Sequence, residues 1–223
     1  MTILCIETST SVCSAAICKD GEPIKQCINY EGSNHARLLP LYIEELLTFA
    51  REQGLSIEAV ALSEGPGSYT GLRIGTSTAK GLCYGLNVPL IPVPTLEVLC
   101  EAAKSSISNL QSSILIPMID ARRMEVYTMI QGETKAVVVE NEESLYPGDE
   151  EVYYFGDGAE KCSKVFTKTN WHYLPGIVPE AKTLALTVGS PSVDCRAIHD
   201  IAYYEPYYLK EFVAAQSHVK GLK

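Results

Sequence analysis

The first residues of chemical interest are Glu7, Thr8 and Ser9, which follow an apolar run near the N-terminus. A carboxylate and hydroxyls in a turn between two strands can hold a phosphate or a metal-bound water through side chains and backbone N–H groups. A hydroxyl-rich hairpin turn without any ligand explains the same three residues. They are therefore candidate ligand contacts, with the plain turn left open as the alternative.

A second candidate is the segment Gly-Pro-Gly-Ser-Tyr-Thr-Gly at residues 65–71. Glycines allow positive φ and close backbone approach, and the helix expected to follow points its positive end at this loop. The Gly-Lys-Ser/Thr ending of a phosphate-binding P-loop is absent. A tight corner between a strand and a helix is the competing interpretation.

Two consecutive arginines, Arg122 and Arg123, lie between two predicted strands in the segment Asp120–Glu125. A guanidinium group at such a position can bind an anion or an RNA phosphate. A solvated hairpin tip is an equally good explanation. We expect these arginines to be possible ligand or RNA contacts, without choosing between the two interpretations.

Two predicted helices carry more apolar or small-residue surface than one core requires. Residues 36–50 show two apolar stripes, and residues 71–86 include four glycines, each costing about 1 kcal/mol against alanine in a helix. A groove of small groups lets another helix approach closely. The predicted partner interface comprises Leu39, Ile43, Leu46, Ala50, Gly71, Gly75, Thr78 and Leu82. This interface predicts that Gly75→Arg abolishes assembly and leaves the fold intact; burial of both stripes within one chain is the alternative.

Other catalytic patterns are missing from the sequence. The four histidines are scattered and show no metal-ligand spacing: His35, His172, His199 and His218. No Gly-x-Ser-x-Gly nucleophile elbow occurs. The eight cysteines include no Cys-x-x-Cys pair and fall mostly within predicted strands or helices, which favours buried, reduced thiols. No metal or other cofactor is expected.

The elements that position these residues alternate between strands and helices. Strands are expected at 2–7, 12–18, 24–30, 59–63 and 89–93, with helices at about 34–52, 70–86 and 95–104. The second half is expected to hold strands at 114–120, 125–130, 134–139, 151–155 and 171–174 and a short helix near 180–188. Either Ser33 or Asn34 is expected to cap the first helix. Because the second half partly repeats the first, we predict two α/β lobes, at residues 1–104 and 105–223.

Composition is that of a globular protein, with 46% hydrophobic and 20% charged residues. The net charge of −9 disfavours broad, unaided binding to RNA, because an acidic protein repels phosphate backbones. No stretch approaches the roughly 20 apolar residues of a membrane span. We therefore expect a cytoplasmic protein with no membrane contact.

Several motifs together resemble the TsaB family. They are Ile-Glu-Thr-Ser at 6–9, Gly-Pro-Gly-Ser-Tyr-Thr-Gly-Leu-Arg-Ile-Gly at 65–75, Pro-Val at 92–93, Thr-Leu-Glu at 95–97 and Asp-Ala-Arg at 120–122. The resemblance covers about residues 1–130 and thins out beyond them. It implies a two-lobed actin/sugar-kinase/Hsp70-like (ASKHA, RNase H-like) α/β fold with a reduced second lobe.

The same resemblance implies a subunit that is not itself an enzyme. TsaB is a paralogue of TsaD, which transfers threonylcarbamoyl to the adenosine beside the anticodon of tRNA. The two metal-binding histidines of TsaD correspond here to Thr95 and Leu99, which cannot replace imidazole ligands. The implied partners are TsaD in a heterodimer, TsaE in a larger complex and a second copy of the chain, with tRNA reached indirectly through the complex.

Two enzymatic alternatives compete with this expectation. The first is a small ASKHA-type ATP-dependent kinase or ATPase that uses the Glu7-Thr8-Ser9 turn, and fold analogy alone supports it. The second is a peptidase, which the absence of a metal site or nucleophile set disfavours.

Overall fold

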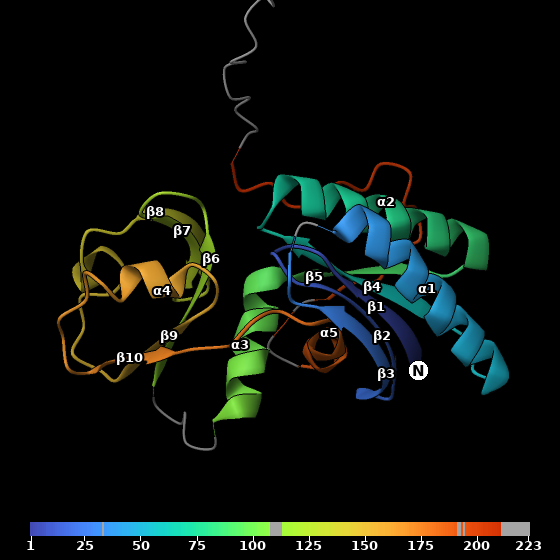
Figure 1. Ribbon diagram of the computed structural model, residues 1–223, viewed down its shortest axis with the longest axis horizontal. Coiled ribbons are helices and arrows are strands. Elements are labelled where there is room, and N and C mark those ends of the chain that lie inside the picture. The colour runs from blue at the N-terminus through green and yellow to red at the C-terminus, as the bar shows by residue number, and fades with distance from the viewer. Residues whose placement is uncertain (33, 108–112, 191–192, 194, 211–223) are drawn as a thin grey trace, which may run out of the picture.

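The computed structural model describes residues 1–32, 34–107, 113–190, 193 and 195–210. Ser33, His218 and residues 108–112 of the predicted lobe boundary lie outside the described residues. Two five-stranded mixed sheets form the centres of two lobes (Figure 1). The first sheet contains β1 (Thr2–Glu7), β2 (Cys13–Lys19), β3 (Glu22–Asn29), β4 (Ala59–Gly65) and β5 (Leu90–Pro94). The second contains β6 (Ile114–Asp120), β7 (Glu125–Ile130), β8 (Glu133–Val138), β9 (Val152–Phe155) and β10 (Trp171–Leu174).

The two sheets share one connectivity. The strand orders are β3-β2-β1-β4-β5 and β8-β7-β6-β9-β10. In each sheet the first three strands of the chain pair antiparallel, and the last two join the first in parallel. The partial repeat seen in the sequence is therefore a repeat of sheet topology. The predicted strands are confirmed to within two residues at either end.

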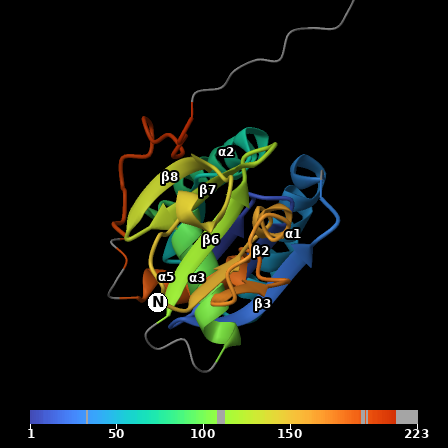
Figure 2. The ribbon, with the colours of Figure 1, turned by 90° about the vertical axis from the view of Figure 1, so that its left-hand side faces the viewer.

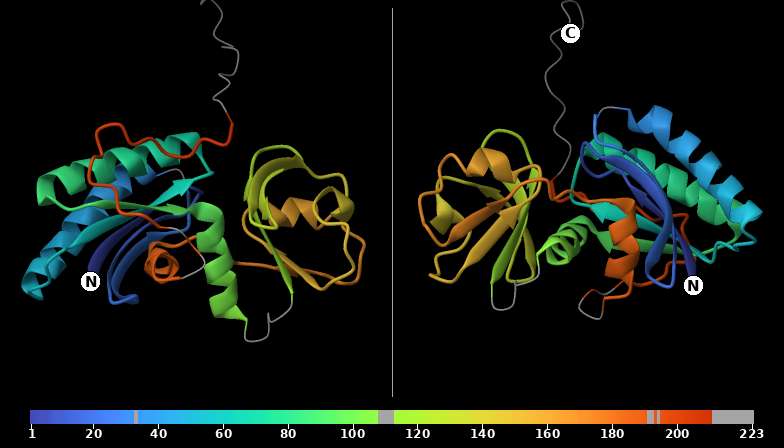
Figure 3. Two further views of the ribbon diagram at one scale, coloured as in Figure 1. Left: turned by 180° about the vertical axis from the view of Figure 1, so that it is seen from behind. Right: turned by 60° about the horizontal axis from the view of Figure 1, so that its bottom comes forward.

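Both faces of the first sheet are covered, which explains why β1 is apolar along its length. Leu4 and Ile6 pack under α1 (His35–Glu52) and α2 (Tyr69–Leu86). Ile3 and Cys5 point the other way, toward α5 (Ala181–Val188), because successive strand residues face opposite sides. Figures 1 and 3 show the two long helices on one side of the sheet and α5 on the other.

The ends of α2 follow from its sequence. The Ser68 side chain caps its start by accepting a hydrogen bond from the Gly71 N–H at 3.3 Å. Asn87 ends the helix in the left-handed conformation, with φ of 54°. The helix α1 starts after Asn34, one of its two expected caps, although the Asn34 side chain forms no capping hydrogen bond.

The helix α3 (Thr95–Ser106) lies between the lobes. Its residues Leu96, Leu99, Cys100 and Ala103 pack against Ile119 and Phe155 of the second sheet. Figure 2 shows α3 behind the second sheet. The second lobe also contains the short helices η1 (Glu142–Ser144) and α4 (Ala159–Cys162).

The chain returns to the first lobe after β10. The Ala181 N–H donates to the Ser14 hydroxyl at 2.9 Å, and α5 packs on the first sheet. Ile198 then pairs with Leu90 of β5 in an antiparallel bridge. The predicted division into 1–104 and 105–223 is therefore too simple at its C-terminal end, because the described residues after about 180 build the first lobe. The periodicity of a sequence shows that a helix forms, but it does not show which lobe a later helix packs against.

The cysteines are free thiols, as expected. Seven of the eight are buried, and Cys195 is half-buried. Burial raises the pKa of Cys13, Cys83 and Cys162 to about 11, so these thiols stay protonated near neutral pH. Within the described part of the chain, no helix is both long enough and apolar enough to cross a membrane.

Candidate functional site: the interlobe cleft and the α1–α2 groove

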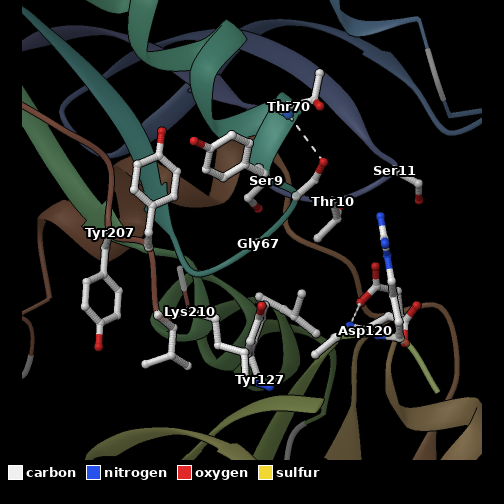
Figure 4. A pocket seen from close by; sticks show the side chains of 18 of the residues that line it. Ser9, Thr10, Ser11, Gly67, Thr70, Asp120, Tyr127, Tyr207 and Lys210 are labelled. Atoms are coloured by element: carbon white, nitrogen blue, oxygen red, sulfur yellow. Dashed lines mark hydrogen bonds between the residues drawn. The ribbon is translucent and has the colours of Figure 1, made fainter. Parts of the chain in front are cut away.

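A cleft of about 840 Å³ opens between the two lobes. The first lobe contributes the turn after β1 and the start of α2, and the second contributes the β6–β7 turn. The C-terminal residues 207–210 close the remaining side. Figure 4 shows this arrangement, with Ser9 and Thr10 on one wall and Asp120 and Tyr127 on the other.

The Glu7-Thr8-Ser9 turn uses its polar atoms internally. One carboxylate oxygen of Glu7 accepts from both the backbone N–H and the hydroxyl of Ser9, each at 2.6 Å. The Thr8 hydroxyl donates to the Gly71 carbonyl at 2.8 Å. All three residues are completely buried, and of the three only Ser9 lines the cleft. In the structure, these three predicted ligand contacts therefore use their polar groups to hold the turn and the start of α2 together.

The glycines of α2 let the helix pack directly on that turn. A Cβ atom on Gly71 would lie less than 3.0 Å from the Thr8 carbonyl oxygen. One on Gly75 would lie less than 3.0 Å from the Thr8 hydroxyl. Gly67 meets the Ser9 carbonyl in the same way. The tight strand-to-helix corner is therefore the interpretation of residues 65–71 that fits the contacts.

Glu7 is a fully buried acid, and it forms no salt bridge with any residue that the structure describes. Its second carboxylate oxygen has no hydrogen-bond partner among the described residues. Burial raises the pKa of Glu7, and the hydrogen bonds from Ser9 offset part of that rise. Glu7 therefore keeps its proton to higher pH in the folded chain than in the unfolded chain.

This difference predicts a pH-dependent stability. The folded state binds the Glu7 proton more tightly than the unfolded state does. The stability that this proton contributes is therefore complete below the ordinary glutamate pKa and is lost as pH rises through the folded-state pKa. Glu7→Gln keeps an uncharged side chain of the same shape. We expect the variant to gain stability relative to the wild type as pH rises from 4 to 8, by about 1.4 kcal/mol for each unit of pKa difference. Urea unfolding at several pH values measures this gain, and parallel pH profiles would contradict it.

Arg122 and Arg123 form the tip of the β6–β7 hairpin. Both have left-handed backbone conformations, with φ of 69° and 50°, which non-glycine residues adopt at a cost. Arg122 lines the cleft, while Arg123 is exposed outside it. Neither guanidinium group forms a hydrogen bond or ion pair with another described residue. Asp120, by contrast, pairs with Lys161 and accepts from the Arg122 N–H at 3.2 Å.

The positions that correspond to metal ligands in TsaD have other contacts here. The Thr95 hydroxyl bonds to the Ser63 hydroxyl at 2.7 Å and accepts from the Gly65 N–H at 3.0 Å. Leu99 is buried in the apolar cluster around α3. In the part of the chain that the structure describes, no three His, Cys, Asp or Glu side chains are grouped to hold a metal ion.

The predicted partner interface needs correction at five of its eight residues. Leu39, Leu46 and Ala50 belong to this chain's own core, at 3% exposure or less. Gly71 and Gly75 face Thr8 and not a partner. Gly75→Arg would therefore drive a side chain into the core and would not leave the fold intact. Thr78 and Leu82 are half-buried and lie beside α1.

A surface groove does lie between α1 and α2. It has a volume of about 460 Å³, and its lining residues are Pro40, Ile43, Glu44, Leu47, Arg51, Ser77, Thr78, Gly81 and Leu82. Ile43, which is mostly buried, still reaches its floor, so three of the predicted residues contribute to it. Exposed Leu41 and Tyr84, at 55% and 87%, lie on the same two helices.

The outer face of α2 carries small residues, of which helical spacing places Gly85 on the predicted groove face and leaves out Ser77 and Gly81. Gly81 and Gly85 are exposed, and an added Cβ would meet nothing within 4 Å at either position. With Ser77 they form a stripe at a spacing of four residues. The sequence contained a signal for these residues. Two glycines in the second half of α2 cost helix stability, although no described part of the same chain packs closely against them.

Comparison with known proteins supports the architecture and the family. The family model described as TsaD, tRNA N6-adenosine threonylcarbamoyltransferase, matches residues 30–153. The chain is similar to YeaZ from Pseudomonas aeruginosa, with a TM-score of 0.69 and 26% identity over 93% of this chain and 99% of that one. An uncharacterized Pseudomonas aeruginosa protein with similarity to peptidase YeaZ has a TM-score of 0.73 at 24% identity, covering 94% and 99% of the two chains. The two-lobed α/β fold is thereby confirmed.

Sequence relatives agree with this architecture. The TsaB protein of Haemophilus influenzae is 36% identical over 129 residues, which are 57% of this chain and 52% of the relative. That of Bacillus subtilis is 34% identical over 129 residues, which are 57% and 54% of the two chains. The chain thus spans about half the length of these relatives. Because the TsaD family model also covers more than half of this sequence, the chain belongs to the family that this model describes, and its relatives include the TsaB proteins.

Proposed function

We propose that this chain is a non-catalytic subunit that binds TsaD and supports threonylcarbamoyl transfer to the adenosine next to the anticodon of tRNA. Family membership supports the pathway, since the matched relatives are tRNA threonylcarbamoyladenosine biosynthesis proteins. The family model is also that of the transferase itself. Because this chain is related to the transferase in sequence, we expect its helices to have counterparts in the transferase. Matching helices would let the two proteins pair through equivalent surfaces, in a pseudo-symmetric dimer.

The α1–α2 groove is the observation that carries the proposal. Its floor is apolar, and the stripe of Ser77, Gly81 and Gly85 leaves room for a helix backbone at close range. Glu44 and Arg51 supply opposite charges at its rim, which favours one docking orientation over others. Exposed glycines in a helix cost stability, and a partner helix that packs on them offsets that cost.

The kinase or ATPase alternative has less support. Such an enzyme needs free polar groups at the Glu7-Thr8-Ser9 turn, whereas the three residues are buried and hydrogen-bonded to their own neighbours. Close packing of α2 on Thr8 also fills the space beside the turn. The peptidase alternative lacks a nucleophile set or a metal group among the described residues.

Further partners follow from the same proposal. Self-association would use the groove that TsaD uses, so the two complexes would compete. TsaE would join only the heterodimer. Contact with tRNA would be indirect, through the complex. A direct phosphate contact, the alternative, would use Arg122 and Arg123. A cytoplasmic location remains a prediction.

Mixing the chain with the TsaD of the same organism tests the proposal. Size-exclusion chromatography with light scattering should give one species with the summed mass of the two chains. The chain alone reports self-association, against its mass of 24.4 kDa. Separate elution of the two proteins, with TsaE and nucleotide present, would reject the partner role. Turnover of ATP by the isolated chain would support the kinase instead.

A further inference from the structure

The C-terminal residues Ile198–Lys210 run from the first sheet, along α2, to the mouth of the interlobe cleft (Figure 3). Their start is fixed on β5, where Leu90 and Ile198 exchange backbone hydrogen bonds of 2.9 and 2.7 Å. Ile201 and Tyr204 then pack on the core cluster under α1 and α2. The segment thus begins as an integral part of the first lobe.

Its middle is held by α2 and by the end of β4. The Lys80 ammonium donates to the carbonyls of Ala202 and Tyr204 at 2.8 and 3.2 Å. The Tyr207 N–H donates to the Glu64 carbonyl at 2.8 Å. Gly65 allows this approach, because a Cβ there would lie 2.5 Å from the Tyr207 carbonyl oxygen.

Aromatic contacts continue the attachment toward the cleft. The rings of Tyr208 and Tyr69 lie 4.8 Å apart. The Arg73 guanidinium group lies over the Tyr69 ring, 4.1 Å from its centroid, and bonds to the Tyr208 hydroxyl at 3.4 Å. The contact between the two tilted rings and the cation over one of them make this end of α2 a firm support for residues 207–208.

The last described residue crosses to the other lobe. The Lys210 ammonium pairs with the Glu125 carboxylate of β7 at 2.5 Å. Lys161 donates to the backbone carbonyl of Glu125 at 2.6 Å, which ties the backbone of this residue to α4 in the second lobe. Lys210 and Tyr127 both line the cleft at this point (Figure 4).

The two ends of the cleft are held by contacts of different strength. At the base, α3 joins the lobes through fully buried Leu99, Ala103 and Phe155. At the mouth, the Lys210–Glu125 pair has side-chain exposures of 48% and 20%. An ion pair this exposed contributes little to stability and breaks at little cost, whereas an apolar cluster resists opening. Of these two contacts, the one at Lys210 is therefore the easier to break.

We propose that Ile198–Lys210 is a latch that holds the interlobe cleft closed, with Lys210–Glu125 as its releasable contact. The segment from Ile198 to Tyr208 stays on the first lobe when the cleft opens. The latch acts within this chain, whether or not a partner is bound.

Charge reversal at the releasable contact tests the latch. Spin labels at Thr48→Cys and Val138→Cys, both exposed and on different lobes, report the interlobe distance by pulsed electron resonance, with Cys195→Ser as background. Lys210→Glu and Glu125→Lys should each shift the distribution to longer distances, raising the open fraction about threefold to tenfold. The double variant, which restores opposite charges, should recover the closed distribution.

A matched control separates the latch from a general charge effect. Lys25→Glu makes the same charge change in an ion pair with Glu45 that lies within the first lobe, and it should leave the distances unchanged. Lys210→Gln gives a milder loss of the pair, and circular dichroism verifies that each variant is folded. Distances for Lys210→Glu and Lys210→Gln equal to those of the wild type would overturn the proposal. So would a double variant that stays as open as the single ones.

Discussion

Gly81→Arg is expected to weaken binding of this chain to TsaD by about 2–4 kcal/mol, or roughly thirtyfold to a thousandfold, without altering its fold. Gly81 is exposed, and an added Cβ meets nothing within 4 Å, so the arginine fits its own chain. It would project over the groove, into the space that a partner helix must occupy. Burial of an unpaired guanidinium group in that interface adds to the loss. Titration calorimetry with the TsaD of the same organism measures the change.

Two controls belong with this variant. Gly81→Ala adds only a methyl group and should retain most of the affinity. Ser105→Arg introduces the same charge at an exposed position near the end of α3, which does not line the groove, and should bind like the wild type. A dissociation constant for Gly81→Arg within about threefold of the wild-type value would exclude the groove as the interface, since hot-spot substitutions cost far more.

The fold was largely predictable because most of its elements carry local signals. The run of apolar residues in β1 marks a strand covered on both faces, and Ser68 marks the start of α2. The return of α5 to the first sheet could not be predicted in this way. Its position depends on contacts such as that between Ala181 and Ser14, which are 167 residues apart in the sequence.

The candidate interface was predicted less well, for a reason that α1 makes clear. Its two apolar stripes differ by about 100°, and either one could face the core by periodicity alone. The structure buries Leu39 and Leu46 completely, and Leu38, Tyr42 and Phe49 of the second stripe are half-buried against the same core cluster. Both stripes therefore pack within this chain, and the sequence of a helix alone does not show how wide a face its sheet covers.

The glycines of α2 show the same limit in another form. Gly71 and Gly75 share a helix face with Thr78 and Leu82, as the helical spacing predicts, yet the first two meet Thr8 while the last two border the groove. One helix face therefore meets the β1–β2 turn at one end and borders the surface groove at the other.

This division predicts stability changes of opposite sign within one helix. Gly71→Ala is expected to destabilise the fold by about 3 kcal/mol, at the upper end of the usual cost of overpacking. Its Cβ would lie less than 3.0 Å from the Thr8 carbonyl, a backbone atom that cannot rotate away. Any retreat of Thr8 also loses the 2.8 Å hydrogen bond from its hydroxyl to Gly71. Gly81→Ala should instead stabilise the fold by about 0.5–1 kcal/mol, since alanine favours the helix and meets no neighbour.

Urea unfolding of the two variants and the wild type gives both values on one scale. The identical chemical change, a single methyl group in the same helix, removes side-chain type as an explanation for any difference. Equal effects at the two positions would mean that helix propensity alone governs α2 and that its N-terminal half does not depend on contact with the β1–β2 turn. A difference of about 4 kcal/mol would show that this contact places the helix, and with it both the groove that faces outward and the buried turn beneath.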